Sequence, residues 1–296
     1  MGSSALSGEA PSVGDGQQSG HQAADTTVVR VRHYGRAIAA VIVVALVAAV
    51  GYYGFATNPN IKWSIVRQYL FDPNILRGLR TTLEMTVIGT AVSLIGALIV
   101  ALMRTSQSRV IRSVAWFYVY TFRGIPIILL LIFVGNLGLF VKTITAGIPF
   151  TDVVFFSRPS ASLLTPFVAS IIGLSLAGSA YMGEIVRGGL LSVGQGQRQA
   201  AKALGLNALQ TTRHVILPPA LRVIVPPMGN EVIAMLKATA IVTVIGGGDL
   251  LTVTQSLAGL NYRTIEMLLV AAIWYFAVIG VMSIGQYYLE KRTAER

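Results

Sequence analysis

Five charged residues lie in or at the ends of long apolar stretches, where ionisable side chains are most costly. They are Glu84, Arg123, Glu184, Glu231 and Lys237. A charge at the centre of a bilayer costs about 2.5–3.5 kcal/mol on insertion scales, so such a residue needs a charged partner or water. We therefore treat all of them except Glu84 as candidates to line the path of a polar solute.

Most of these residues also have a purely structural interpretation. Glu84 and Arg123 are near the ends of their apolar stretches, from which long side chains reach the membrane interface. Glu184 precedes Arg187 by three residues, a spacing that favours an ion pair on one face of a helix. For the remaining two charges, the functional and the structural interpretations both stay open.

Polar and proline residues precede Glu231 in the same apolar stretch. Pro226 and Pro227 have no backbone donors and leave carbonyl groups free, which favours a kink in a helix. Asn230 carries a neutral hydrogen-bonding group that either joins two helices or lines a polar cavity. We expect the prolines to form a hinge, and Asn230 to lie with Glu231 on the solute path.

A polar stretch over residues 199–218 interrupts the apolar segments. Its first part, residues 199–204, is predicted to be helical. Gly205 then ends this helix, because glycine tolerates the left-handed conformation of a helix terminus. A second helical run is expected to end at the Leu-Pro pair of the stretch. The small side chains of Ala200 and Ala201 suit a docking element that enters a groove of another protein; a solvated connector is the alternative.

The composition indicates that a bilayer is the solvent of this chain. Of its 296 residues, 54% are hydrophobic and 12% are charged, compared with about 25% charged residues in soluble domains. Apolar stretches long enough to cross a membrane predict an all-α polytopic protein with six transmembrane helices. We expect these helices over residues 37–56, 82–103, 114–141, 164–186, 223–245 and 265–288.

The distribution of Lys and Arg predicts the orientation. More of them lie on the side of both termini and of the loop 187–222 than on the other side, so this side is cytoplasmic. Cleavage of a signal peptide after residues 54–56 is an alternative to a retained first helix. We divide the chain into a disordered cytoplasmic tail over 1–29, a first helix with an external amphipathic segment over 30–80, a membrane domain over 81–289 and a cytoplasmic tail over 290–296.

Several chemistries find no support in the sequence. The chain has no Cys, and its three His residues are scattered, so we expect no thiolate chemistry, metal site or other cofactor. No phosphate-binding G-x-x-x-x-G-K-[ST] motif or hydrolase motif occurs, and we expect no enzymatic activity in this polypeptide. The formal net charge of +11 follows from membrane topology and lipid contact, and we expect no nucleic-acid partner.

The spacing around Gly205 resembles the signature of the membrane permease subunits of bacterial ABC importers for polar amino acids. This signature is Glu-Ala-Ala, three residues, Gly, nine residues and Ile-x-Leu-Pro. Gln199 replaces the glutamate and Val215 the isoleucine, so the first position offers a neutral hydrogen bond instead of a charge. The matching positions are Gln199, Ala200, Ala201, Gly205, Val215, Leu217 and Pro218.

The resemblance extends over about residues 76–289 and implies an inner-membrane translocation subunit with a five-helix core and an extra amino-terminal helix. It implies three protein partners: a cytoplasmic ATP-binding subunit, a second permease in a homo- or heterodimer, and an extracytoplasmic solute-binding protein. Residues 199–206 would be the coupling helix, and the matched positions other than Val215 would contact the ATPase. Glutamate or another polar amino acid is the expected substrate.

Three other functions are alternatives at this stage. A permease for another small polar solute would share most of these features. An ion-coupled secondary carrier would use the intramembrane charges to bind the coupling ion, although no repeated halves are visible in the sequence. A structural membrane scaffold is disfavoured by the cost of placing Glu231 and Lys237 in an apolar segment.

Overall fold

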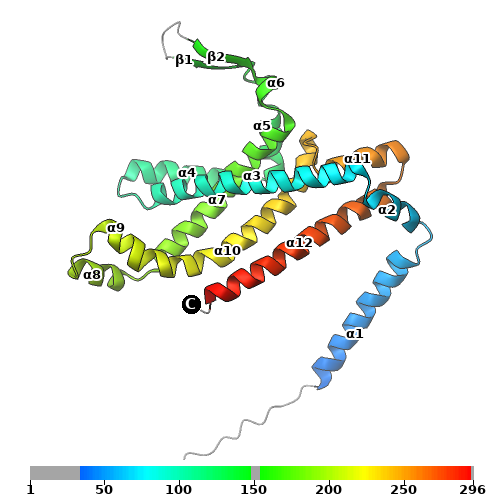
Figure 1. The fold of residues 1–296 in the computed structure, drawn as a ribbon, viewed down its shortest axis with the longest axis horizontal. Helices are drawn as coiled ribbons and strands as arrows, with labels where there is room; N and C mark the ends of the chain where they lie inside the picture. The colour runs from blue at the N-terminus through cyan, green and yellow to red at the C-terminus, as the bar shows by residue number, and fades with distance from the viewer. Residues whose placement is uncertain (1–33, 148–153, 295–296) are drawn as a thin grey trace, which may run out of the picture. The chain divides into compact units, whose positions relative to one another are not determined.

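The computed structural model describes residues 34–147 and 154–294 and divides into two compact units, residues 1–58 and 59–296 (Figure 1). The first unit contains helix α1 (Tyr34–Gly51) and a π-helical turn η1 (Tyr52–Ala56). This confirms a helix near the first expected span, although its apolar part, Ile38–Gly54, is shorter than the long helices of the second unit. The expectations for residues 1–29 lie outside the described residues.

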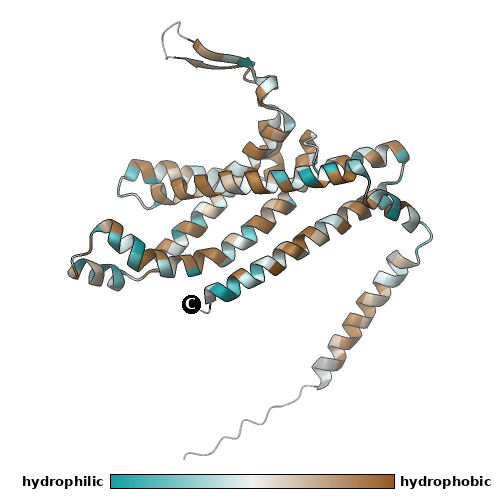
Figure 2. Ribbon diagram, in the orientation of Figure 1, coloured by the Kyte–Doolittle hydropathy of each residue, from teal (hydrophilic) through white to brown (hydrophobic). Residues whose placement is uncertain are grey.

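The second unit is almost entirely helical. Four of its helical segments are long and apolar enough to cross a membrane: α3, α7, α12 and the segment that contains α10. Hydrophobic residues run along them, whereas hydrophilic residues gather at the carboxyl end of α12 (Figure 2). The elements are α2 (Trp63–Leu70), α3 (Pro73–Arg104), α4 (Arg109–Gly124), α5 (Ile127–Gly135), η2 (Leu137–Leu139), β1 (Thr143–Gly147), β2 (Val154–Pro159), α6 (Ser160–Leu163), α7 (Pro166–Ser192), α8 (Gln195–Ala203), α9 (Ala208–Gln210), η3 (Thr211–Ile216), α10 (Leu217–Ala238), η4 (Thr239–Ile245), α11 (Leu250–Asn261) and α12 (Thr264–Ala294).

The region of the expected span over residues 114–141 is not one straight helix. Helices α4 and α5 occupy this region, and the chain bends by 101° between them. Pro126 disfavours the helical conformation of the residue before it, and Ile125 is extended, with φ −79° and ψ 129°. The described residues thus hold four long spans, or five if α4 and α5 together form one.

The expected domain boundary between residues 80 and 81 falls inside α3. The Asp-Pro-Asn sequence at residues 72–74, which is typical of a turn, begins this helix. Asp72 is the N-cap and accepts a hydrogen bond of 2.8 Å from the backbone N–H of Asn74. Pro73 occupies the first turn, where its missing N–H costs no helical hydrogen bond. The sequence also gave no indication of the antiparallel β1–β2 hairpin or of α11.

Small residues allow α3 and α7 to pack closely at the centre of the second unit. A Cβ atom on Gly96 of α3 would lie 2.7 Å from the Cβ of Ser179, and one on Gly183 of α7 would lie 2.8 Å from Val100. The run of small residues over 177–180 is buried. These residues allow the close approach, because small side chains let helix backbones come together in membranes.

The amphipathic segment before α3 is also anchored. Val66 of α2 is buried in a cluster with Ile75, Leu250 and Met267. The indole N–H of Trp274 in α12 donates a hydrogen bond of 2.8 Å to the carbonyl oxygen of Leu70. Helix α2 is therefore fixed to the ends of α11 and α12.

Candidate functional site

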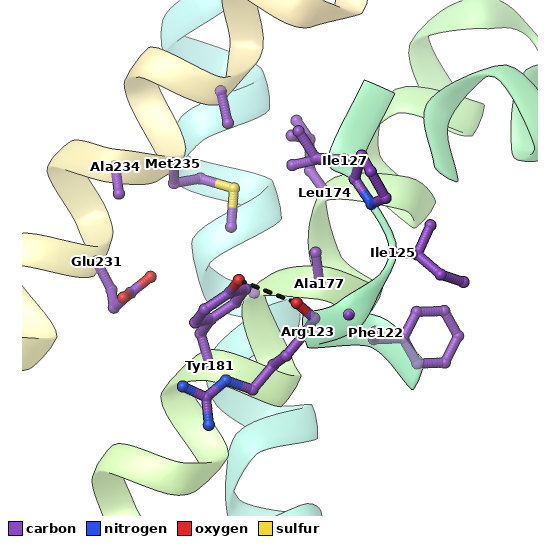
Figure 3. Close-up of a pocket in the computed structure, with 14 residues that line it drawn as sticks. Phe122, Arg123, Ile125, Ile127, Leu174, Ala177, Tyr181, Glu231, Ala234 and Met235 are labelled. Atoms are coloured by element: carbon purple, nitrogen blue, oxygen red, sulfur yellow. Dashed lines mark hydrogen bonds between the residues drawn. The ribbon is translucent and has the colours of Figure 1, made fainter. Parts of the chain in front are cut away.

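A pocket of about 420 Å³ lies between the α4–α5 bend, α7 and α10 (Figure 3). Its volume is in the range of about 300–1,000 Å³ that is usual for small-molecule sites. We call it the Arg123 pocket. Its lining residues are Phe122, Arg123, Gly124, Ile125, Pro126, Ile127, Leu174, Ala177, Gly178, Tyr181, Glu231, Ala234, Met235 and Ala238.

The bend between α4 and α5 creates one wall of this pocket. Helix α4 ends at Gly124, and the N–H of Ile125 still bonds to the carbonyl oxygen of Thr121 at 3.0 Å. Pro126 has no N–H to continue the helix. Residues 122–127 at this bend all line the pocket. This agrees with the general rule that non-helical backbone at membrane depth lines a cavity or is buried in protein.

Arg123 and Tyr181 are in contact at this wall. The Arg123 guanidinium carbon lies 4.9 Å from the centre of the Tyr181 ring, and the Tyr181 hydroxyl donates a hydrogen bond of 3.4 Å to the Arg123 carbonyl oxygen. A guanidinium within about 6 Å of an aromatic ring is stabilised by the ring's negative face. Tyr181 therefore holds Arg123 at the pocket without neutralising its charge.

Glu231 projects into the Arg123 pocket from α10 (Figure 3). Its side chain is half-buried, and Arg123 lines the same pocket. Within the described part of the chain, Glu231 takes no part in an ion pair of 4.0 Å or less. The pocket thus presents a guanidinium and a carboxylate that are both available to a ligand.

Asn230 and Lys237 do not join Glu231 in this pocket. Asn230 accepts a hydrogen bond of 2.9 Å from Gln286 of α12, so it joins two helices. Lys237 is exposed. It follows Glu231 by six residues, about 1.7 helical turns, which points it to another face of α10. Of the expected path residues on α10, the structure places Glu231 alone in the Arg123 pocket.

Glu184 belongs to a second cluster, next to the Arg123 pocket. Its carboxylate binds Arg187 of the same helix at 2.8 Å, as expected, and Arg104 of α3 at 3.0 Å. A pocket of about 430 Å³ is lined by Arg104 and Glu184 and also by Arg123 and Tyr181. This pocket shares Arg123 and Tyr181 with the Arg123 pocket. Unlike Glu231, Glu184 is paired with two arginines.

Sequence reasoning missed Tyr181 and Arg104. Tyr181 precedes Glu184 by three residues, so the helical period alone would have placed it on the same face. Arg104 ends a different helix, and a contact between residues 80 positions apart leaves no local signal. Glu84 forms an exposed ion pair of 2.7 Å with Arg80, in agreement with its structural interpretation.

The expected stop at Gly205 is confirmed, and α8 ends in a Schellman motif. Gly205 has φ +74°. The N–H of Leu206 bonds to the carbonyl oxygen of Ala201 at 3.1 Å, and the N–H of Gly205 bonds to that of Lys202 at 3.0 Å. These two bonds satisfy carbonyl groups at the helix end and fix the direction of the chain after it.

Two expectations about this stretch need correction. Ala201 is buried against its own chain at 2% exposure, whereas Gln199 and Ala200 are exposed. The exposed surface of α8 therefore includes Gln199 and Ala200 but not Ala201. The second helical run does not end at Leu217 and Pro218, because α9 and η3 lead directly into α10, which begins at Leu217.

The prolines of this region are accommodated in two ways. Pro218 lies in the first turn of α10, at the junction with the π-helical η3. Pro226 and Pro227 lie inside α10, which continues through both as a helix. A hinge at these two residues stays a prediction.

Comparison with known proteins defines the class of this membrane protein. Residues 89–295 match the family described as binding-protein-dependent transport system inner membrane component. The chain belongs to this family, and it is a multi-pass protein of the bacterial inner membrane. The resemblance to permease subunits of amino-acid ABC importers is thereby confirmed, and so are the all-α membrane fold and the need for ATP-binding and solute-binding partners that the family implies.

Named relatives lie in the amino-acid branch. The chain is 40% identical over 261 residues to the arginine transport system permease protein ArgU of Corynebacterium glutamicum, covering 88% of this chain and 80% of the relative. It is 31% identical over 236 residues to the glutamine transport system permease protein GlnP of Escherichia coli K12, covering 79% and 98%. A crystal structure of an amino acid ABC transporter with histidines matches with a TM-score of 0.65 and 31% identity, covering 77% of this chain and 98% of that chain.

Proposed function

We propose that this chain carries a polar amino acid across the membrane and that the amino acid binds in the Arg123 pocket between Arg123 and Glu231. The observation that carries the proposal is that one pocket presents both charges while neither forms an ion pair with the other. An α-carboxylate matches a guanidinium, and an α-ammonium matches a carboxylate. The two groups thus suit the zwitterion that all amino acids share.

The same two charges bear on which amino acid is carried. With the zwitterion paired, a second carboxylate on the substrate would share the pocket with Glu231, and like charges at close range are unfavourable in apolar surroundings. We therefore favour a neutral or cationic polar amino acid over glutamate. The relatives named for arginine and glutamine transport agree with this preference.

We propose further that α8 couples this site to a cytoplasmic ATPase. The exposed residues Gln199 and Ala200 form its docking surface, together with the turn at Gly205. From there the chain runs through α9 and η3 directly into α10, the helix that carries Glu231. A displacement of α8 can thus reach the substrate pocket through the turn at Gly205 and the continuous helical segment from α9 to α10, with Pro226 and Pro227 as the place where α10 bends.

Lys237 supports the presence of a second permease subunit. It is exposed on a helix that is long and apolar enough to span the membrane. A lysine that faced hydrocarbon there would cost about 2.5–3.5 kcal/mol. We propose that a second permease, identical or related, covers this face of α10 or encloses a water-filled path beside it.

The docking role is tested with Ala200→Trp, which adds bulk on the exposed face of α8. The permease is reconstituted in vesicles with its ATPase and solute-binding protein, and uptake of labelled arginine or glutamine is measured. We expect Ala200→Trp to abolish ATP-dependent uptake while the permease still inserts, and Ala200→Ser at the same position to keep it. Wild-type uptake by the tryptophan variant would reject the docking surface.

A further inference from the structure

A further cleft, which shares no lining residue with the Arg123 pocket, has the character of an anion site. It lies where the carboxyl ends of α3 and α7 meet α8 and η3, and its volume is about 340 Å³. Three arginines from three elements line it: Arg104, Arg187 and Arg198. We call it the arginine cleft.

The arginine cleft has more cations than the described residues of the chain neutralise. Arg104 and Arg187 share the single carboxylate of Glu184, at 3.0 and 2.8 Å. Arg198 donates to the carbonyl oxygen of Leu190 at 2.5 Å, a neutral acceptor that leaves its charge unpaired. The three guanidiniums and one carboxylate therefore leave an excess of positive charge in a partly buried place. Guanidinium groups bind phosphate with matched geometry.

The rim of the cleft is apolar. Leu102 of α3 and Leu191 of α7 both line it, and their exposures are 66% and 55%. These leucines belong to the carboxyl-terminal parts of helices that are long and apolar enough to span the membrane. A cationic floor beside exposed leucines fits a ligand with an anionic head and hydrocarbon chains.

We propose that the arginine cleft binds the phosphate-bearing headgroup of an anionic phospholipid of the cytoplasmic leaflet, with the acyl chains against Leu102 and Leu191. Basic pockets between membrane helices on the cytoplasmic side bind such headgroups. The choice of leaflet rests on the proposed function, which places α8 at the cytoplasmic face. A lipid bound here would join α3, α7 and α8, and would thereby hold the docking element against the transmembrane helices.

Arg198→Gln is the most informative substitution. It removes one charge from the cleft but keeps a donor for the Leu190 carbonyl, and it leaves the Glu184 ion pairs intact. Arg198→Lys is the rescue variant, because it restores the charge. Arg213→Gln is the matched control: Arg213 is exposed on η3, carries the same charge and does not line the cleft.

The test measures lipid retention by native mass spectrometry of the purified transporter complex in detergent, with added phosphatidylglycerol or phosphatidylcholine. We expect the wild type, Arg198→Lys and Arg213→Gln to retain phosphatidylglycerol in preference to phosphatidylcholine. Arg198→Gln should bind phosphatidylglycerol about fivefold more weakly, as expected for the loss of one basic contact with an anionic lipid. No transport is needed for this readout, so it stands apart from the test of the proposed function.

Three outcomes would overturn the proposal. Equal retention of phosphatidylglycerol by wild type and Arg198→Gln would show that the cleft is not the lipid site. Displacement of the lipid by inorganic phosphate as readily as by phosphatidylglycerol would identify a free anion as the ligand. If the Arg198→Gln variant retains lipid like the wild type but no longer holds the ATPase, an acidic surface of the ATPase fills the cleft.

Discussion

The guanidinium of Arg123 lies 4.9 Å from the ring centre of Tyr181, and the Tyr181 hydroxyl bonds to the Arg123 backbone at 3.4 Å. If the ring holds the guanidinium in place for the substrate carboxylate, Tyr181→Phe should keep the wild-type KM for amino-acid uptake. Tyr181→Ala should raise this KM about two- to fivefold. This factor corresponds to the loss of a cation–π contact worth about 0.5–1 kcal/mol. Equal KM values for both variants would contradict the role of the ring.

The carboxylate of Glu231 should be required for substrate affinity. Glu231→Gln removes the charge and keeps the shape of the side chain. We expect the KM for uptake to rise about tenfold or more, because a hydrogen bond to a charged group contributes about 1.5–3 kcal/mol. Concentration-dependent uptake into vesicles measures this effect.

Glu84→Gln is the control for Glu231→Gln. Glu84 is also a glutamate in a membrane helix, but it forms an exposed pair with Arg80, and such pairs contribute about 0–1 kcal/mol. Uptake by Glu84→Gln should therefore match the wild type. A similar loss in both variants would mean that Glu231 acts through general electrostatics or folding and not through substrate binding.

Glu184 should be important for stability, because two arginines share its carboxylate at 15% side-chain exposure. Glu184→Gln is expected to lower the free energy of unfolding by about 2–3 kcal/mol, as these charged hydrogen bonds are lost. The melting temperature of the detergent-solubilised protein, compared with that of the wild type, reports the change.

A double-variant cycle separates the ion pair from other effects of these substitutions. Arg104→Gln removes the partner of Glu184 on α3. The double variant, Arg104→Gln with Glu184→Gln, should lose less free energy of unfolding than the sum of the losses in the two single variants. Strict additivity would show that the 3.0 Å contact between these two side chains contributes nothing.

The turn after α8 depends on the backbone conformation of Gly205. A Cβ atom at this position would meet no atom within 4 Å, so its φ of +74° alone decides which residues fit. Gly205→Val should distort the end of α8, at a cost of about 1–2 kcal/mol, and reduce uptake relative to ATP hydrolysis. Gly205→Asn should retain most coupling, since Asn adopts the left-handed region more readily. Equal coupling in both variants would exclude a role for this turn.

Features encoded by neighbouring residues could be predicted from the sequence. Gly205 ends α8 as expected, and the Glu184–Arg187 pair forms at its helical spacing. In each case the signal lies within one helical turn or in one residue's backbone preference. The family signature is also read without tertiary contacts, because it is a fixed spacing of residue types along the 199–218 stretch.

Features that depend on the path of the chain in space could not be predicted. Arg104 reaches Glu184 across the α3–α7 contact, and Tyr181 meets Arg123 across the α4–α7 contact. The apolar run over 114–141 concealed the 101° bend, because hydropathy does not register a change of direction. Asn230 and Glu231 are adjacent in sequence, yet the helical rotation sends one toward α12 and the other into the pocket.

The most direct test of the central claim is the energy source of uptake. The permease is reconstituted with its ATPase and solute-binding protein, and uptake of labelled arginine and glutamine is followed with ATP, with a non-hydrolysable ATP analogue, or with an imposed Na⁺ or H⁺ gradient. We expect uptake that requires ATP hydrolysis and the ATPase and that persists when ionophores collapse all gradients. Uptake driven by an ion gradient in the absence of ATP would contradict an ABC import mechanism and would indicate an ion-coupled carrier.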